Sequence, residues 1–66
     1  MPVINIDLGL GQTSEGQRKQ LISRLASDAA EITGIPAEKF ITFIHEVPLE
    51  NIGVGGRTVK EIKAGR

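Results

Sequence analysis

The sequence predicts an α+β fold, in which one strand–helix–strand unit is followed by a glycine-rich hairpin or a short arm. Three observations predict it: an apolar β-branched run opens the chain, a long helical pattern follows, and a second apolar run comes after the helix. A connection of this length favours parallel strands with a right-handed crossover. With 66 residues and neither a linker nor an internal repeat, the chain is expected to form a single domain over residues 1–66.

The first strand is expected over residues 3–8, directly after Met1-Pro2. Successive side chains of a strand point to opposite faces, so aliphatic side chains line one face, while Asn5 and Asp7 lie on the other. The glycines at positions 9 and 11 then predict a turn.

The helix is expected over residues 15–33. Ser14 has the character of an N-cap, and Gln17 three residues later completes a capping box. Gly34 is suited to the position after the helix, and Pro36 prevents its continuation. The apolar positions recur with helical period, at Leu21, Ile22, Leu25, Ala26, Ala29 and Ile32. The basic residues are interpreted as a solvated face: Arg18, Lys19 and Arg24.

The second strand is expected over residues 40–47, where Pro48 stops it. It is apolar on both faces, and one helix can cover only one of them. Two strands alone are also too few for a stable sheet. We therefore predict an obligate oligomer, in which another subunit covers the second face.

Shorter elements fill the rest of the chain. Residues 36–39 are expected to make one helical turn, 48–51 a turn, and 53–56 a glycine-rich bend. The tail over 57–66 carries apolar residues three positions apart and is predicted to be a short helix or a hairpin arm.

Composition excludes several kinds of function. Eight basic and eight acidic residues balance, which argues against nucleic acid as a partner. The absence of cysteine and the presence of one histidine argue against a disulfide, a thiolate metal site or a histidine cluster. No run approaches the ~20 apolar residues of a membrane span, and no signal peptide is recognisable, so a cytoplasmic protein without a membrane partner is expected. A domain of this size buries only about 60% of its unfolded surface, which again favours association.

The chemistry is expected at Pro2. Removal of Met1 would expose a secondary amine at the head of a strand, and free α-amino groups titrate near ~8, where general bases work well. With Met1 retained, the same nitrogen is an amide and has no free lone pair. An apolar pocket would lower the pKa of the amine by disfavouring its charged form.

These residues resemble the 4-oxalocrotonate tautomerase family over almost the whole chain. The matching segments are Met1-Pro2-Val3-Ile4, Ser14-Glu15-Gly16-Gln17, Leu21-Ile22, Pro36, Ile44-His45-Glu46-Val47 and Ile52-Gly53-Val54-Gly55-Gly56. The resemblance implies a homo-oligomer, built from dimers with a shared four-stranded sheet and commonly a hexamer. It also implies a cofactor-independent isomerase, of the kind used in the breakdown of aromatic compounds, in which Pro2 moves a proton on an unsaturated 2-oxo acid.

Other binding positions of the family differ here. Members that use dicarboxylates carry an arginine before the helix, where this chain has Gln12, and a second in the next strand, where it has Ile41. Their aromatic residue before the glycine bend corresponds to Ile52. Glutamine and isoleucine cannot grip a carboxylate with two parallel hydrogen bonds as a guanidinium does. Arg57, beside the bend, is a candidate to bind a carboxylate from another direction, and the chain resembles a divergent branch of the family.

The functional prediction is therefore a tautomerase acting on a 2-hydroxymuconate-like or monocarboxylate substrate. An enolate intermediate needs a donor, and the candidates are Gln12, backbone N–H groups or an arginine of a neighbouring subunit. The alternatives are hydratase or dehalogenase chemistry on the same proline, and a non-enzymatic oligomer. His45 and Glu46 are interpreted as structural. The glycine-rich segment 9–14 lacks the third glycine of a dinucleotide fingerprint, and no cofactor is expected.

Overall fold

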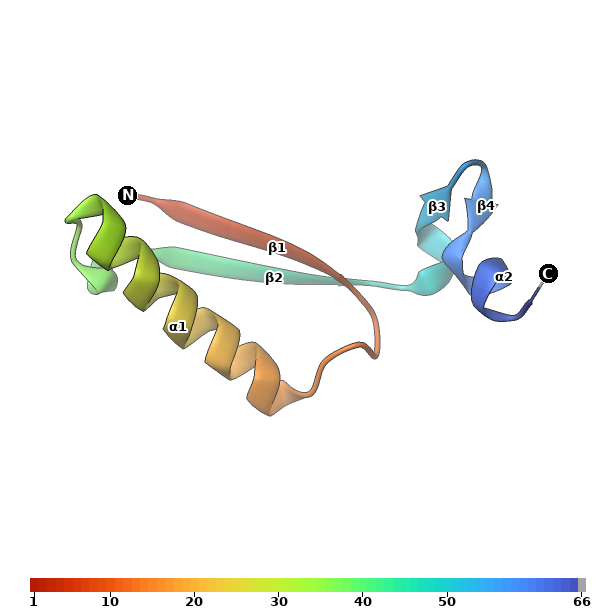
Figure 1. Cartoon of the computed structure of the whole chain (residues 1–66), viewed down its shortest axis with the longest axis horizontal. Helices are drawn as coiled ribbons and strands as arrows, with labels where there is room; N and C mark the ends of the chain where they lie inside the picture. The colour runs from red at the N-terminus through yellow and green to blue at the C-terminus, as the bar shows by residue number, and fades with distance from the viewer. Residues whose placement is uncertain (66) are drawn as a thin grey trace.

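The computed structural model describes residues 1–65 and shows a βαβ unit followed by a small hairpin and a helix (Figure 1). Strand β1 (Val3–Gly9) pairs in parallel with β2 (Ile41–Val47), and helix α1 (Glu15–Thr33) connects them. The predicted α+β fold with parallel strands is confirmed. Strand β1 continues one residue beyond the predicted end, and β2 begins one residue later than predicted.

Helix α1 begins and ends as the sequence predicts. The Ser14 hydroxyl accepts the backbone N–H of Gln17 at 3.1 Å, and the Gln17 side chain accepts the backbone N–H of Ser14 at 2.9 Å. At the other end, Gly34 adopts a φ of 77°, and its N–H donates to the carbonyl of Ala30 at 2.9 Å. Only glycine adopts this left-handed backbone readily, so the residue sets the end of the helix.

The segment after β2 forms a separate small lobe. Strands β3 (Gly53–Val54) and β4 (Arg57–Thr58) pair antiparallel, and helix α2 (Val59–Lys63) follows. Two short 3₁₀ turns, η1 (Ala37–Lys39) and η2 (Leu49–Asn51), flank β2. The tail predicted over residues 57–66 therefore contains both predicted forms, because Arg57–Thr58 is one arm of the hairpin and Val59–Lys63 is a short helix. Its last residue, Arg66, lies outside the described residues. Figure 1 shows the hairpin and α2 beyond the carboxyl end of the sheet, away from α1.

Helix α1 covers one face of the sheet and leaves the other open. Ile4, Ile6 and Leu8 are half-buried beneath the helix, whereas Val3 and Phe43 on the open face are 48% and 50% exposed. Within residues 1–65 no hydrophobic side chain is fully buried. Hydrophobic burial is the main favourable contribution to folding, so a single copy of this chain has little to stabilise it.

None of the helices within residues 1–65 has both the length and the apolar character needed to cross a membrane.

Candidate functional site

Pro2 lies at the amino-terminal edge of the sheet, beside the start of β2. Its carbonyl oxygen accepts the backbone N–H of Ile41 at 3.0 Å, which extends the pairing of β1 and β2 by one residue. The structure therefore brings together two of the predicted site residues. Because the carbonyl is held by the sheet, the position of the adjacent ring is fixed by the backbone.

Pro2 and Ile41 line one cavity of about 490 Å³. The other lining residues are Met1, Ile35, Glu38 and Lys39. The isoleucines supply apolar surface, and turn η1 supplies the two charged side chains. Removal of Met1, which is 90% exposed, would leave the Pro2 nitrogen as an amine at this cavity without disturbing a packed side chain.

Gln12 lies at the opposite end of the sheet, in the loop between β1 and α1. Its side-chain oxygen accepts the backbone N–H of Gly9 at 3.0 Å. Gly9 is the only buried residue within the described part of the chain, and a Cβ there would lie 3.0 Å from both Gln12 and Leu49. The Gln12 oxygen therefore closes the loop, and the residue also lines a cavity of about 500 Å³ beside α1.

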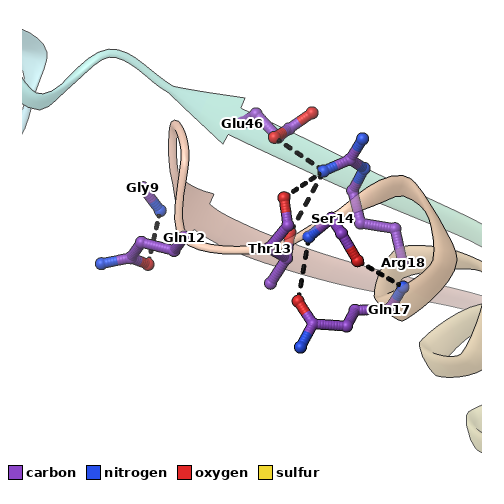
Figure 2. Close-up of polar contacts among 7 residues, drawn as sticks. All are labelled: Gly9, Gln12, Thr13, Ser14, Gln17, Arg18 and Glu46. Atoms are coloured by element: carbon purple, nitrogen blue, oxygen red, sulfur yellow. Dashed lines mark hydrogen bonds and ion pairs between the residues drawn. The ribbon is translucent and has the colours of Figure 1, made fainter.

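Arg18 ties the same loop to β2 (Figure 2). Its guanidinium Nη1 donates to the Thr13 carbonyl at 2.7 Å and to its hydroxyl at 3.3 Å, and it pairs with Glu46 Oε2 at 3.2 Å. The prediction that Arg18 belongs to a solvated face is wrong, because its side chain is only 26% exposed. No local pattern indicates this contact, because Glu46 lies 28 residues away along the chain. The structural interpretation of Glu46 agrees with the geometry.

Ile52 and Arg57 belong to the carboxy-terminal lobe. The Ile52 carbonyl accepts the N–H of Val59 at 2.8 Å, which anchors α2 beside the hairpin, and Arg57 is exposed on β4. Figure 1 shows this lobe at the far end of the molecule from the amino terminus.

One chain therefore does not assemble all the predicted binding residues. The seven residues of β1 span roughly 20 Å between Pro2 and the loop that holds Gln12. A site that combined Pro2 with Gln12, Ile52 or Arg57 would have to take them from different copies of the chain.

His45 lies on the open face of the sheet, far from Pro2 along the strands. Its Nδ1 lies 3.3 Å from Asp7 Oδ1, and its ring stacks on Phe43 with the ring centroids 6.3 Å apart. Both members of the pair are exposed, at 55% and 78% of their side-chain surface. The contact joins neighbouring positions of β1 and β2, which fits the structural interpretation of His45.

Comparison with known proteins gives matches over almost the whole chain. Residues 2–62 match the family described as tautomerase enzyme. A 2-hydroxymuconate tautomerase of Pseudomonas putida is 37% identical over 62 residues, which cover 94% of this chain and 97% of that protein.

Solved structures agree in fold. A 4-oxalocrotonate tautomerase homologue of the tomaymycin biosynthetic pathway superposes with a TM-score of 0.90 at 35% identity, covering 96% of this chain and 95% of that one. A heterohexameric 4-oxalocrotonate tautomerase from Chloroflexus aurantiacus gives a TM-score of 0.86 at 29% identity, with 94% of this chain and 98% of that chain covered.

Proposed function

The chain belongs to the 4-oxalocrotonate tautomerase family, and on that premise we propose that it catalyses keto–enol or double-bond isomerisation of an unsaturated 2-oxo acid. Pro2, freed by removal of Met1, is the acid and base of this proposal. The observation that carries it is the position of Pro2, whose carbonyl is bonded to Ile41 and whose ring lines the cavity between the strand edge and η1. The tautomerase name of the Pseudomonas putida relative supports the same reaction class.

The proton transfer needs one group that changes its protonation state twice. The neutral nitrogen of Pro2 takes the proton from the enol oxygen of the substrate, and the electrons of that bond form the carbonyl. The resulting pyrrolidinium returns the proton to carbon at the end of the conjugated system, so the amine is regenerated and no co-reactant is consumed. Such a positioned acid and base typically contributes ~10²–10⁴ to the rate.

The walls of the cavity suit this role. Ile35 and Ile41 exclude part of the water around the ring. Less water disfavours the charged pyrrolidinium relative to the neutral amine, which keeps a larger share of Pro2 competent as a base.

The direct test compares two forms of the same chain that differ only in Met1. Intact mass identifies the form, and ultraviolet absorbance follows ketonisation of 2-hydroxymuconate and phenylenolpyruvate. The trimmed form is expected to accelerate at least one of these reactions, and the Met1-bearing form neither. Equal rates for the two forms would refute the role of Pro2. Borohydride trapping with an aldehyde independently reports a reactive secondary amine on the trimmed form alone.

We further propose that the active form is a homo-oligomer with a dimeric building block, and a hexamer as the complete assembly. The absence of a fully buried hydrophobic side chain within residues 1–65 supports this, as do the open sheet face and the unpaired outer edge of β1 in the single chain. The heterohexameric 4-oxalocrotonate tautomerase from Chloroflexus aurantiacus is consistent with it.

Sedimentation measures this assembly directly. Phe43→Glu places a charge on the open face, where Phe43 is 50% exposed in the single chain, and is expected to shift the species towards monomer. Phe43→Leu keeps an apolar side chain and is the matched control, expected to remain assembled. A wild-type monomer at micromolar concentration would overturn the proposal.

A further inference from the structure

Turn η1 contributes one charged side chain of each sign to the cavity beside Pro2. Among the side chains of the described residues that line it, Lys39 carries the only positive charge and Glu38 the only negative one. The α-ammonium of Met1, which also lines the cavity, is lost when Met1 is removed. Neither side chain makes an ion pair within residues 1–65, so both remain available to a ligand. The remaining lining is apolar or proline.

The backbone holds this turn against the strand edge. The N–H of Lys39 donates to the Pro36 carbonyl at 3.0 Å, and the N–H of Phe40 donates to the Ala37 carbonyl at 3.1 Å. Ile41, two residues after Lys39, donates to the Pro2 carbonyl at 3.0 Å. The base of the Lys39 side chain is thus fixed relative to Pro2, while its flexible stem allows the ammonium to meet a bound ligand.

The arginines described by the structure are less suitable for this position. Arg18 is already bonded to Thr13 and Glu46, and if it bound a ligand instead, the loop before α1 would no longer be held to β2. Arg24 lines the cavity that contains Gln12, and Arg57 lies in the carboxy-terminal lobe.

We propose that Lys39 binds the carboxylate of the substrate held at Pro2, and that Glu38 restricts this substrate to one carboxylate. The inference rests on the proposed function and specifies its substrate class: 2-oxo acids, or their enols, with a single carboxylate and an uncharged remainder. An ammonium forms strong charge-assisted hydrogen bonds with one carboxylate. A second carboxylate in the same cavity would lie near Glu38, and like charges at short range repel.

The test measures KM and kcat of the Met1-free protein with phenylenolpyruvate, which has one carboxylate. Lys39→Gln is expected to raise KM about tenfold, the size of one lost charge-assisted hydrogen bond, with a smaller change in kcat. Lys39→Arg keeps the positive charge, so its KM should lie much closer to that of wild type than the KM of Lys39→Gln does. Lys63→Gln, which removes a lysine of α2 outside the cavity, is the matched control and leaves KM unchanged.

Two comparisons assign the effect to the carboxylate. The methyl ester of phenylenolpyruvate keeps the enol but has no carboxylate, and its KM should be the same for wild type and Lys39→Gln. Glu38→Gln should raise kcat/KM for the dicarboxylate 2-hydroxymuconate, relative to phenylenolpyruvate, by roughly threefold, as expected for an exposed charge. An equal KM increase for acid and ester would show that Lys39 acts only on structure and would overturn the proposal.

The inference can fail while the proposed function stands. If the wild-type protein turns over phenylenolpyruvate, and Lys39→Gln behaves as Lys63→Gln does, Lys39 is not the carboxylate ligand. Calorimetric binding of cinnamate, a monocarboxylate that cannot tautomerise, gives a readout that is independent of turnover. Wild type and Lys63→Gln should bind it about tenfold more tightly than Lys39→Gln. Equal affinities would overturn the inference even if no tautomerase activity were found.

Discussion

The two ends of the β1–β2 sheet are built differently. The amino-terminal end, with Pro2, is held by one backbone hydrogen bond and opens into a cavity. The carboxyl end also borders a cavity, beside Gln12, but there the polar side chains close the loop: the Gln12 oxygen accepts the N–H of Gly9, and Arg18 joins Thr13 to Glu46. At the proposed substrate site the charged side chains of Glu38 and Lys39 form no ion pair within residues 1–65, whereas at the loop the polar side chains bind other residues of the chain.

The largest effect is expected at the open end. Pro2→Ala in the trimmed protein should lower kcat/KM at least ~100-fold, because alanine leaves an amine that is no longer held by a ring. The backbone bond to Ile41 does not depend on the side chain, so circular dichroism should be unchanged. A Pro2→Ala protein with the kcat/KM of wild type would show that Pro2 is not the acid and base, and that the amino-terminal end of the sheet has no catalytic role.

At the closed end, Gly9→Ala should be the most destabilising change. Its Cβ would lie 3.0 Å from the side chains of Gln12 and Leu49, and overpacking of this kind costs about 1–3 kcal/mol. The matched control is Gly16→Ala on α1, where the new Cβ meets only the Ser14 hydroxyl, at 3.9 Å. That change should stabilise by up to about 1 kcal/mol. Urea unfolding at one fixed protein concentration compares the two, and a Gly9→Ala protein as stable as wild type would contradict the packing argument.

Two substitutions of Gln12 can test its role in holding the loop separately from a role in substrate binding. Gln12→Ala removes the acceptor of the Gly9 N–H and should cost about 1 kcal/mol of stability. Gln12→Glu keeps an acceptor oxygen but removes the amide donor, so its stability should stay close to that of wild type. If Gln12 of a neighbouring copy also binds substrate, as its sequence position suggests, Gln12→Glu should raise KM. Equal unfolding midpoints for Gln12→Ala and wild type would show that the loop does not need this bond.

The smallest effect is expected at the pair of Arg18 and Glu46. Both side chains are partly exposed, at 26% and 28%, so solvent and salt weaken their attraction. Glu46→Gln should destabilise by less than about 0.5 kcal/mol, whereas Arg18→Met, which also loses the Thr13 carbonyl, should cost about 1 kcal/mol. The difference should be visible in the urea midpoints. A larger loss of stability from Glu46→Gln than from Arg18→Met would show that the ion pair, and not the bond to Thr13, holds the loop.

Much of the fold was predictable because its signals are local. The capping box at Ser14 and the left-handed Gly34 set the bounds of α1, and both are read from residues close together in the sequence. For the tail the sequence predicted either a short helix or an arm, because two apolar residues three positions apart fit both. Its form depends on Thr58, whose hydroxyl accepts the N–H of Glu61, and on the bond from Val59 to Ile52.

The site was predictable only in part. Pro2 stands out from its position and chemistry, and Ile41 was predicted only because it corresponds to an arginine position of the family. The role of Arg18 could not be predicted, since its partner Glu46 comes from a strand that only the folded chain brings beside the helix. The proposed role of Lys39 could not be predicted either, because Lys39 comes near Pro2 through the parallel pairing of the strands and not through any motif around it.

By itself the sequence determined the order of elements and the limits of the long helix, because caps and periodicity act through near neighbours. It also led to the prediction of a partner, since the second strand is apolar on both faces. The tertiary structure decided which polar side chains bond to other residues of the chain and which remain available to a ligand. It paired Gln12 with Gly9 and Arg18 with Glu46, and left Lys39 unpaired beside Pro2. The physical reason is that hydrogen bonds and ion pairs act over a few ångströms in space, whatever the separation of the residues along the chain.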